Sequence, residues 1–125
     1  MDPKPSILIV DDEPANIDLL RAQLGAGYRI RAATSGARAL AAARKAPPPD
    51  LLLLDAMMPE LDGFGLCEQL RADPTTAALP VIFISGSAAP ADRARAAALG
   101  ARDYLTKPVA TETLLAAVQA ALAPI

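Results

Sequence analysis

Four short apolar runs of the sequence are each followed by polar side chains that could do chemistry. An acidic trio follows the first run, and a single carboxylate, a hydroxyl and a lysine follow the later ones. In chain order, these residues are Asp11, Asp12, Glu13, Asp55, Ser85 and Lys107. The chain contains no histidine and one cysteine, which excludes a His/Cys zinc site, an internal disulfide and Ser-His-Asp or Cys-His catalysis. Any chemistry must therefore come from carboxylates, hydroxyls and lysine.

Carboxylates that gather at one place repel one another unless a cation joins them. Oxygen ligands without imidazole or thiolate suit Mg²⁺ better than zinc or copper, and bound Mg²⁺ keeps water and contacts phosphate oxygens of a substrate. The residues therefore indicate chemistry on a phosphoryl group. Lys107 would add a second positive charge and Ser85 a hydrogen bond to that group. Asp55 is the candidate nucleophile, because a carboxylate can accept phosphate as an aspartyl phosphate.

These side chains can meet only if the secondary structure brings the ends of the apolar runs together. The runs alternate with helical patterns along the chain, and several are apolar without alternation, as in strands buried on both faces. A repeating strand–helix order predicts one α/β domain with a parallel sheet, whose ligands bind at the carboxyl ends of the strands. The expected strands are 7–10, 29–32, 51–54, 81–84 and 103–105, and the expected helices are 14–24, 36–46, 64–72, 91–99 and 111–123.

Length and charge narrow the classes of function. The chain has 125 residues, a net charge of -2 and no linker or low-complexity tail, so we expect a single domain over 1–125, with its core at about 6–123 and no output domain. It lacks the basic excess of a nucleic-acid or anionic-membrane binder. It also lacks a signal pattern and any apolar run near the ~20 residues of a membrane helix. We therefore expect a cytoplasmic protein without direct contacts to nucleic acid or membrane.

The chain resembles the receiver domain of two-component response regulators over residues 6–123. The resemblance rests on four segments in receiver-like order and spacing, namely 7–14 (ILIVDDEP), 53–63 (LLDAMMPELDG), 80–86 (PVIFISG) and 100–108 (GARDYLTKP). It implies a flavodoxin-like (βα)5 fold, which is a doubly wound sandwich around a five-stranded parallel sheet in the order 2-1-3-4-5. It also implies a cis peptide bond between Lys107 and Pro108.

The resemblance gives each polar residue a role around Mg²⁺, or Mn²⁺ in its place. Glu13 either approaches the metal through water or favours the amino end of the following helix; we place it in the surroundings of the metal rather than on it. By resemblance, the metal ligands are Asp11, Asp12, Asp55 and the backbone carbonyl of Met57, the phosphoacceptor is Asp55, the phosphate contacts are Ser85 and Lys107, and the switch residues are Ser85 and Tyr104.

As a receiver, the protein would take a phosphoryl group from a sensor histidine kinase or a phosphotransfer protein onto Asp55. It would not be a conventional enzyme, although it would catalyse its own aspartyl phosphorylation and dephosphorylation. Inward movement of Ser85 toward the phosphate would free space for Tyr104. The surface of the fourth helix, fifth strand and fifth helix would then change for partner binding or homodimerisation. Met57 would restrict the water that hydrolyses the acyl phosphate.

Three other functions compete with this hypothesis. One is a pseudo-receiver that acts only as a protein interaction module, although no residue needed for phosphorylation is missing. Another is a flavin-binding domain, in which the first loop must hold a phosphate that the acidic trio would repel. The third is a phosphatase with an aspartate nucleophile, but Met57 stands where such enzymes carry a second acid. The chain is either a stand-alone receiver or the amino-terminal piece of a longer protein, and its 11–20 segment resembles receivers that precede cyclic-dinucleotide enzymes.

Several polar residues have simpler structural interpretations. Ser87 competes with Ser85 for the role of switch hydroxyl, but Ser85 directly follows its apolar run. Asp62 and Asp103 follow no such run, so we expect them in turns or on the surface. The remaining expectations are a core or half-buried, unreactive position for Cys67 and a solvated surface for Arg93, Arg95 and Arg102.

Overall fold

The computed structural model describes residues 4–123, which alternate between strands and helices in the order that the sequence predicts. The strands are β1 (Ser6–Val10), β2 (Arg29–Ala33), β3 (Leu51–Asp55), β4 (Val81–Ser85) and β5 (Asp103–Thr106). The helices are α1 (Pro14–Leu24), α2 (Gly36–Arg44), α3 (Gly63–Ala72), α4 (Pro90–Ala98) and α5 (Thr111–Leu122), and a short 3-10 helix, η1 (Gly25–Gly27), follows α1.

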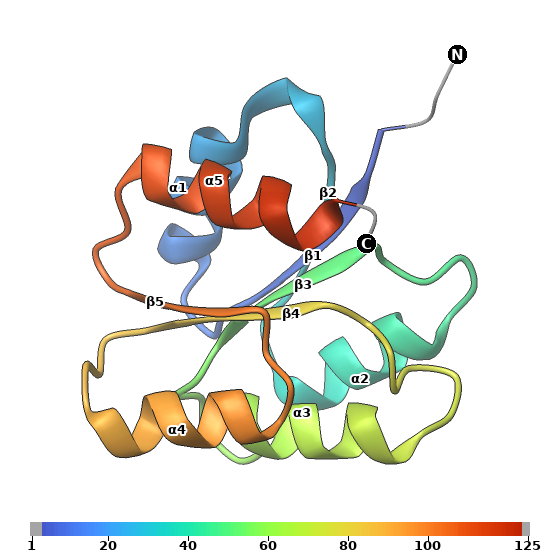
Figure 1. The fold of residues 1–125 in the computed structure, drawn as a ribbon. Coiled ribbons are helices and arrows are strands. Elements are labelled where there is room, and N and C mark those ends of the chain that lie inside the picture. The colour runs from blue at the N-terminus through green and yellow to red at the C-terminus, as the bar shows by residue number, and fades with distance from the viewer. Residues whose placement is uncertain (1–3, 124–125) are drawn as a thin grey trace.

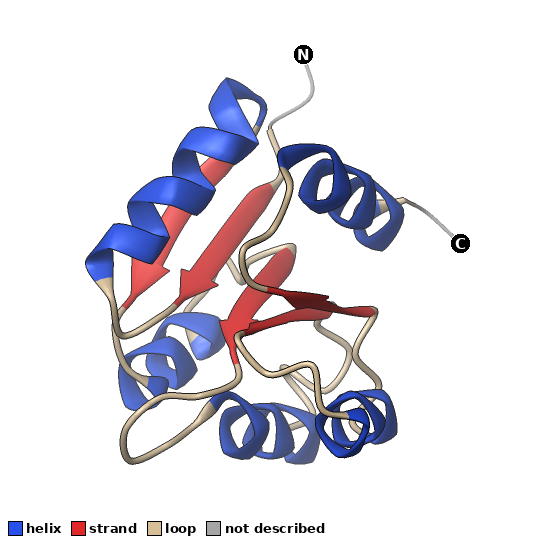
Figure 2. Ribbon diagram, turned by 90° about the vertical axis from the view of Figure 1, so that its left-hand side faces the viewer, coloured by secondary structure: helices blue, strands red, loops and turns tan. Residues whose placement is uncertain are grey.

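The strands form one five-stranded parallel sheet in the order β2-β1-β3-β4-β5. Helices α1 and α5 cover one face of the sheet, and α2, α3 and α4 cover the other (Figures 1 and 2). The predicted doubly wound fold and its strand order are confirmed. Because the five strands are parallel, the residues at their carboxyl ends lie along one edge of the sheet.

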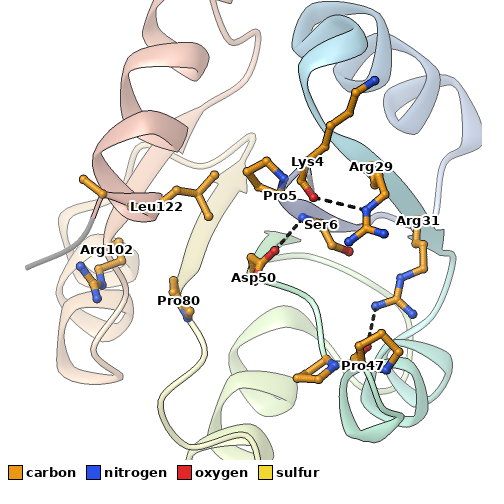
Figure 3. Close-up of a pocket in the computed structure, with 13 residues that line it drawn as sticks. Lys4, Pro5, Ser6, Arg29, Arg31, Pro47, Asp50, Pro80, Arg102 and Leu122 are labelled. Carbon is orange, nitrogen blue, oxygen red and sulfur yellow. Dashed lines mark hydrogen bonds between the residues drawn. The ribbon is translucent and has the colours of Figure 1, made fainter. Parts of the chain in front are cut away.

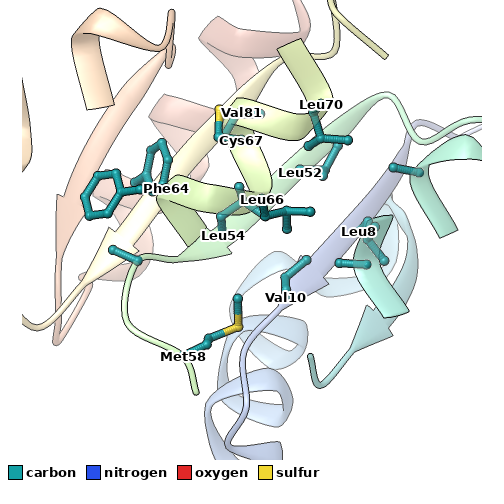
Figure 4. Packing of buried hydrophobic residues seen from close by; sticks show 14 of the residues in the cluster. Leu8, Val10, Leu52, Leu54, Met58, Phe64, Leu66, Cys67, Leu70 and Val81 are labelled. Atoms are coloured by element: carbon teal, nitrogen blue, oxygen red, sulfur yellow. The ribbon is translucent and has the colours of Figure 1, made fainter. Parts of the chain in front are cut away.

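Two apolar layers hold the helices to the sheet. Every residue of β3 and β4 is buried, and successive side chains point to opposite faces. Leu52 and Leu54 pack with Phe64 and Leu66 of α3 on one face (Figure 4), while Leu51 and Leu53 pack against α1 and α5 on the other. Burial of each such side chain contributes roughly 1.5–3 kcal/mol to folding. Cys67 lies fully buried in the first layer, as predicted.

Several element boundaries differ from the prediction by one or two residues. Strands β3 and β4 each include the polar residue expected just after them, because the ladder continues through Asp55 and Ser85. Helix α2 ends at Arg44 rather than at residue 46, since residues that precede proline disfavour the helical conformation. Ser35 caps the amino end of α2, because its hydroxyl accepts a hydrogen bond from the Arg38 N–H at 3.2 Å. The predicted cis bond before Pro108 is also present.

Helix α4 is attached to the domain mainly by polar contacts. Ala96 is its only buried residue, so little apolar area holds it to the sheet. The guanidinium of Arg71 donates to the carbonyl of Leu99 at 2.8 Å just after the helix. Arg93, on the helix itself, donates to the Tyr104 carbonyl and the Thr106 hydroxyl of β5. These contacts replace part of the burial that α4 lacks.

No helix within residues 4–123 is long and apolar enough to cross a membrane.

Candidate functional site

The carboxyl ends of β1, β3, β4 and β5 bring the predicted residues to one edge of the sheet. Asp55 and Ser85 are the last residues of β3 and β4, and Asp11 and Lys107 directly follow β1 and β5. Carboxylate oxygens of Asp11, Asp12 and Asp55 all lie within 4.8 Å of one another. Since residues 11, 55 and 107 are far apart in the sequence, the fold alone creates this cluster.

Lys107 is the only cation in contact with these carboxylates among the described residues. Its Nζ lies 2.9 Å from Asp11 Oδ2 and 3.5 Å from Asp55 Oδ2. Burial alone would lower the pKa of Lys107, but its hydrogen bond with Asp11 and the charge of Asp55 outweigh that effect and raise the pKa. The ammonium is therefore charged at neutral pH and bridges two of the three acids.

Burial is the main cause that raises the pKa of Asp55, and nearby negative charge is the next cause that raises it. Burial of the carboxyl raises this pKa to about 6, and the charges of Asp11 and Asp12 add to the increase, while the Met57 N–H and Lys107 oppose it. The Met57 N–H donates to Asp55 Oδ1 at 3.1 Å, and the Glu13 N–H donates to Asp11 Oδ1 at 2.9 Å. Backbone amides thus orient Asp11 and Asp55. The single positive charge of Lys107 does not neutralise the three carboxylates.

This donor set fits a hard divalent cation. The three carboxylates supply oxygen ligands and an excess of negative charge, with neither imidazole nor thiolate among them, which is the chemistry that Mg²⁺ prefers. Asp12 is half-buried, whereas Asp11 and Asp55 are buried. Metal ligation by the Met57 carbonyl stays a prediction. The Met57 side chain, 62% exposed, lies at the rim.

The two predicted switch residues lie on neighbouring strands, Ser85 at the end of β4 and Tyr104 in β5. Ser85 is fully buried, and its Oγ accepts a hydrogen bond from the Ser87 N–H at 3.1 Å. Ser87 instead donates its hydroxyl to Asp92 at 2.6 Å, which engages it with α4 and favours Ser85 as the hydroxyl of the site. Tyr104 is buried, and its hydroxyl donates to the Ser87 carbonyl at 2.7 Å.

Three other acids lie outside the cluster of Asp11, Asp12 and Asp55. Glu13 is exposed, and its side chain makes no hydrogen bond within residues 4–123 and does not cap α1. Asp62 caps α3 by accepting from the Gly65 N–H at 2.8 Å, and Asp103 begins β5 at the opposite edge of the sheet. The expectation of turn and surface roles for Asp62 and Asp103 agrees with these positions.

Two residues near the site had no assigned role in the sequence interpretation. A Cβ at Gly63 would overlap the backbone oxygen of Asp55, so the loop after β3 closes tightly only with glycine there. Arg93 lies with its guanidinium carbon 5.0 Å from the centre of the Tyr104 ring, although it was expected only to face solvent. A glycine that directly follows Asp62 and precedes the predicted helix 64–72 was a usable signal for a tight turn at Gly63; the sequence contains no comparable signal for Arg93.

A doubly wound parallel sheet with three acids, a lysine and a buried hydroxyl at its carboxyl edge defines a class of α/β domains that carry their functional site at the ends of the strands. The family described as the response regulator receiver domain matches residues 7–119. The chain belongs to this family.

Relatives and solved structures agree with that assignment. RpaA of Synechocystis, a DNA-binding dual master transcriptional regulator, is 43% identical over 119 residues, which are 94% of this chain and 49% of RpaA. PilH of Pseudomonas aeruginosa is 43% identical over 94% of this chain and 97% of its own length. The chain thus spans about half the length of one relative and nearly all of the other. The receiver domain of the P. aeruginosa sensor histidine kinase PA1611, solved with a magnesium ion in its active site cleft, has a TM-score of 0.86 at 30% identity, over 96% of this chain and 98% of its own.

Proposed function

We propose that the protein is a phosphorylatable receiver in which Asp55 accepts a phosphoryl group in a Mg²⁺-dependent reaction. One observation carries the proposal: Lys107 bridges Asp11 and Asp55 while the oxygens of Asp11, Asp12 and Asp55 converge within 4.8 Å. A nucleophile, a cation for the phosphate and a set of metal ligands therefore share one pocket. The magnesium ion in the cleft of PA1611 supports the same assignment.

In this reaction, a phosphoryl group passes from a nitrogen or oxygen atom of the donor to a carboxylate oxygen of Asp55. The P–O bond to Asp55 forms as the bond from phosphorus to the donor breaks, and a donor imidazole leaves as a neutral group after it takes up a proton from water. Asp11, Asp12, Asp55 and the Met57 carbonyl would hold Mg²⁺, which would supply positive charge to the phosphoryl oxygens. Lys107 contributes a second positive charge, and alignment with charge neutralisation suffices for this kind of transfer.

Phosphorylation would change the domain through Ser85 and Tyr104. The new phosphate oxygens offer strong acceptors. Because Ser85 Oγ accepts a hydrogen bond from the Ser87 N–H, a movement of Ser85 that lets its hydroxyl donate to one of these oxygens would also shift the β4–α4 loop. The Tyr104 hydroxyl is bonded to the Ser87 carbonyl, so a shift of the β4–α4 loop also changes the surroundings of the ring. The affected surface consists of α4, β5 and α5, which would bind a partner or a second copy of the chain.

The donor would be a sensor histidine kinase or a histidine phosphotransfer protein in the cytoplasm. RpaA is described as DNA-binding and is about twice as long as the matched segment, whereas nearly all of PilH is matched. The receiver could therefore serve an attached output domain or act alone through protein contacts. In either arrangement, the residues described here would sense phosphate and would not bind nucleic acid directly.

The test is phosphorylation by a small donor. The protein is incubated with acetyl phosphate and Mg²⁺, and intact mass spectrometry measures the phosphorylated fraction. We expect phosphate on the wild type with Mg²⁺ and none in EDTA or in Asp55→Asn. Asp103→Asn, which removes a carboxylate at the other edge of the sheet, should be phosphorylated normally. A wild type that stays unmodified by acetyl phosphate and binds neither Mg²⁺ nor beryllofluoride would favour the pseudo-receiver instead.

A further inference from the structure

The amino edge of the sheet, opposite the Asp55 site, contains a basic cleft of about 880 Å³. Arg29 and Arg31 of β2 stand on one side, Arg102 on the other, and Asp50 lies between them (Figure 3). Lys4 adds a further positive charge at the rim. The four basic residues and one acid give this cleft a positive charge, whereas the whole chain has a net charge of -2.

The arginines of the cleft keep their charge unpaired by carboxylates. Arg29 Nε donates to the Lys4 carbonyl at 3.3 Å, and an Arg31 terminal nitrogen donates to the Pro47 carbonyl at 3.4 Å. Within residues 4–123, no ion pair joins any basic residue of the cleft to an acid. By contrast, Arg44 on α2 pairs with Asp73 at 2.9 Å. Neutral carbonyls therefore hold two guanidinium groups in place while their remaining N–H donors stay available.

Asp50 offsets only part of this positive charge, since four basic residues surround one carboxylate. Its Oδ2 accepts a hydrogen bond from the Ser6 N–H at 2.8 Å, so the carboxylate is used to join β1 to the segment before β3. Proline side chains and Leu122 form apolar walls around it. The cleft thus combines charged donors for an anion with rigid apolar surface for an uncharged group, which is the usual composition of a small-molecule site.

We propose that this cleft binds a small organic phosphate, with its phosphate groups on Arg29, Arg31 and Arg102 and its organic part against the proline and leucine walls. Guanidinium groups suit phosphate because their N–H donors match its oxygens in pairs. The volume lies within the roughly 300–1,000 Å³ of small-ligand sites. A nucleic acid would need a longer basic stripe, and the cleft is concave and bounded on both sides by arginine.

Calorimetric titration with ATP in EDTA tests the proposal, because ATP carries both a polyphosphate and an organic part. We expect saturable binding that weakens about tenfold or more in the double variant Arg29→Gln/Arg31→Gln, as for the loss of charged hydrogen bonds. Arg102→Gln alone should also weaken binding, which keeps the test informative if the double variant fails to fold. Arg38→Gln removes one positive charge, as Arg102→Gln does, but from the exposed surface of α2. This control variant should bind ATP like the wild type.

Asp50→Asn should change the affinity for ATP in the opposite direction, which makes it the most specific test of the proposal. The amide oxygen can still accept from Ser6, but the one negative charge of the cleft is gone, so ATP should bind several-fold more tightly. Amide NMR shifts should appear at residues 29–31 and 102. Shifts confined to residues around Asp55 and Lys107, absence of saturation, equal binding by the double variant, or tighter binding of a hexaglutamate peptide would each overturn the proposal.

Discussion

Replacement of Asp55 by asparagine should stabilise the metal-free domain at neutral pH. Asp55 is 7% exposed and lies beside two other carboxylates, so its ionised form is poorly solvated. Asparagine has nearly the same shape and can still accept the hydrogen bond from the Met57 N–H. The substitution removes the buried charge, and with it both the repulsion by Asp11 and Asp12 and the weaker attraction by Lys107.

The size of the effect follows from the pKa of Asp55, which rises from 3.8 to about 6 on folding. Each pKa unit corresponds to about 1.4 kcal/mol, so ionisation of Asp55 costs the folded state about 3 kcal/mol. Because the pKa of Asp55 is higher in the folded state than in the unfolded state, protonated Asp55 contributes this free energy to folding. The contribution is fully present below pH 3.8 and is lost as the pH rises to about 6. Above that pH, Asp55→Asn should be more stable than the wild type by about 2–3 kcal/mol.

Urea denaturation in EDTA at several pH values between 4 and 7.5 measures this difference. The wild type should lose stability across that range relative to Asp55→Asn, and Mg²⁺ should restore stability to the wild type far more than to the variant. Asp18→Asn, the same charge change on the exposed surface of α1, should match the wild type. The reasoning is wrong if Asp55→Asn is no more stable than the wild type at pH 7.5 in EDTA.

Three further substitutions probe the surroundings of the site. Met57→Asn should hasten loss of phosphate from Asp55, because a polar side chain admits the hydrolytic water that the exposed methionine hinders; phosphate release after removal of the donor measures this rate. Gly63→Ala should cost about 1–3 kcal/mol in urea denaturation, because its Cβ would overlap the Asp55 backbone oxygen. Arg93→Gln should lower the free energy of local opening of α4 by about 1–2 kcal/mol, since the contacts to Tyr104 and Thr106 are lost. Faster amide hydrogen exchange in α4 measures this change.

Each of these substitutions has a matched control. Met57→Leu should release phosphate at the wild-type rate, and an equal or slower rate in Met57→Asn would contradict the water argument. A Cβ at Gly65 would meet the flexible end of the Leu61 side chain at 3.0 Å and Asp62 Oδ1 at 3.4 Å, and no backbone atom, so Gly65→Ala should be milder than Gly63→Ala. For Arg93→Gln, the control is Arg38→Gln on α2; equal protection of α4 in both would show that the Arg93 contacts do not hold the helix.

The sequence predicts the sheet and the acidic site well because both depend on local patterns. Runs such as Leu51–Leu54 are short and apolar throughout, as in strands buried on both faces, and they alternate with helical patterns. Parallel topology then brings Asp11, Asp55 and Lys107 to one edge. The role of Arg93 depends on the distance between α4 and the Tyr104 ring, which no local pattern encodes. The basic cleft was missed because Arg29, Arg31 and Arg102 belong to no recognisable motif, although parallel topology also brings them to one edge of the sheet.

The two edges of the sheet therefore carry opposite charge, which a net charge of -2 conceals. Five-residue strands such as β1 and β3 separate the edges by about 16 Å at roughly 3.3 Å per residue. This separation exceeds the Debye length of about 8 Å at physiological salt. Interactions through the protein interior are screened less than those through solvent. An anion in the basic cleft should hence leave the pKa of Asp55 nearly unchanged. If such an anion alters phosphorylation of Asp55, the coupling must run through the packing of β1 and β3 rather than through direct electrostatics.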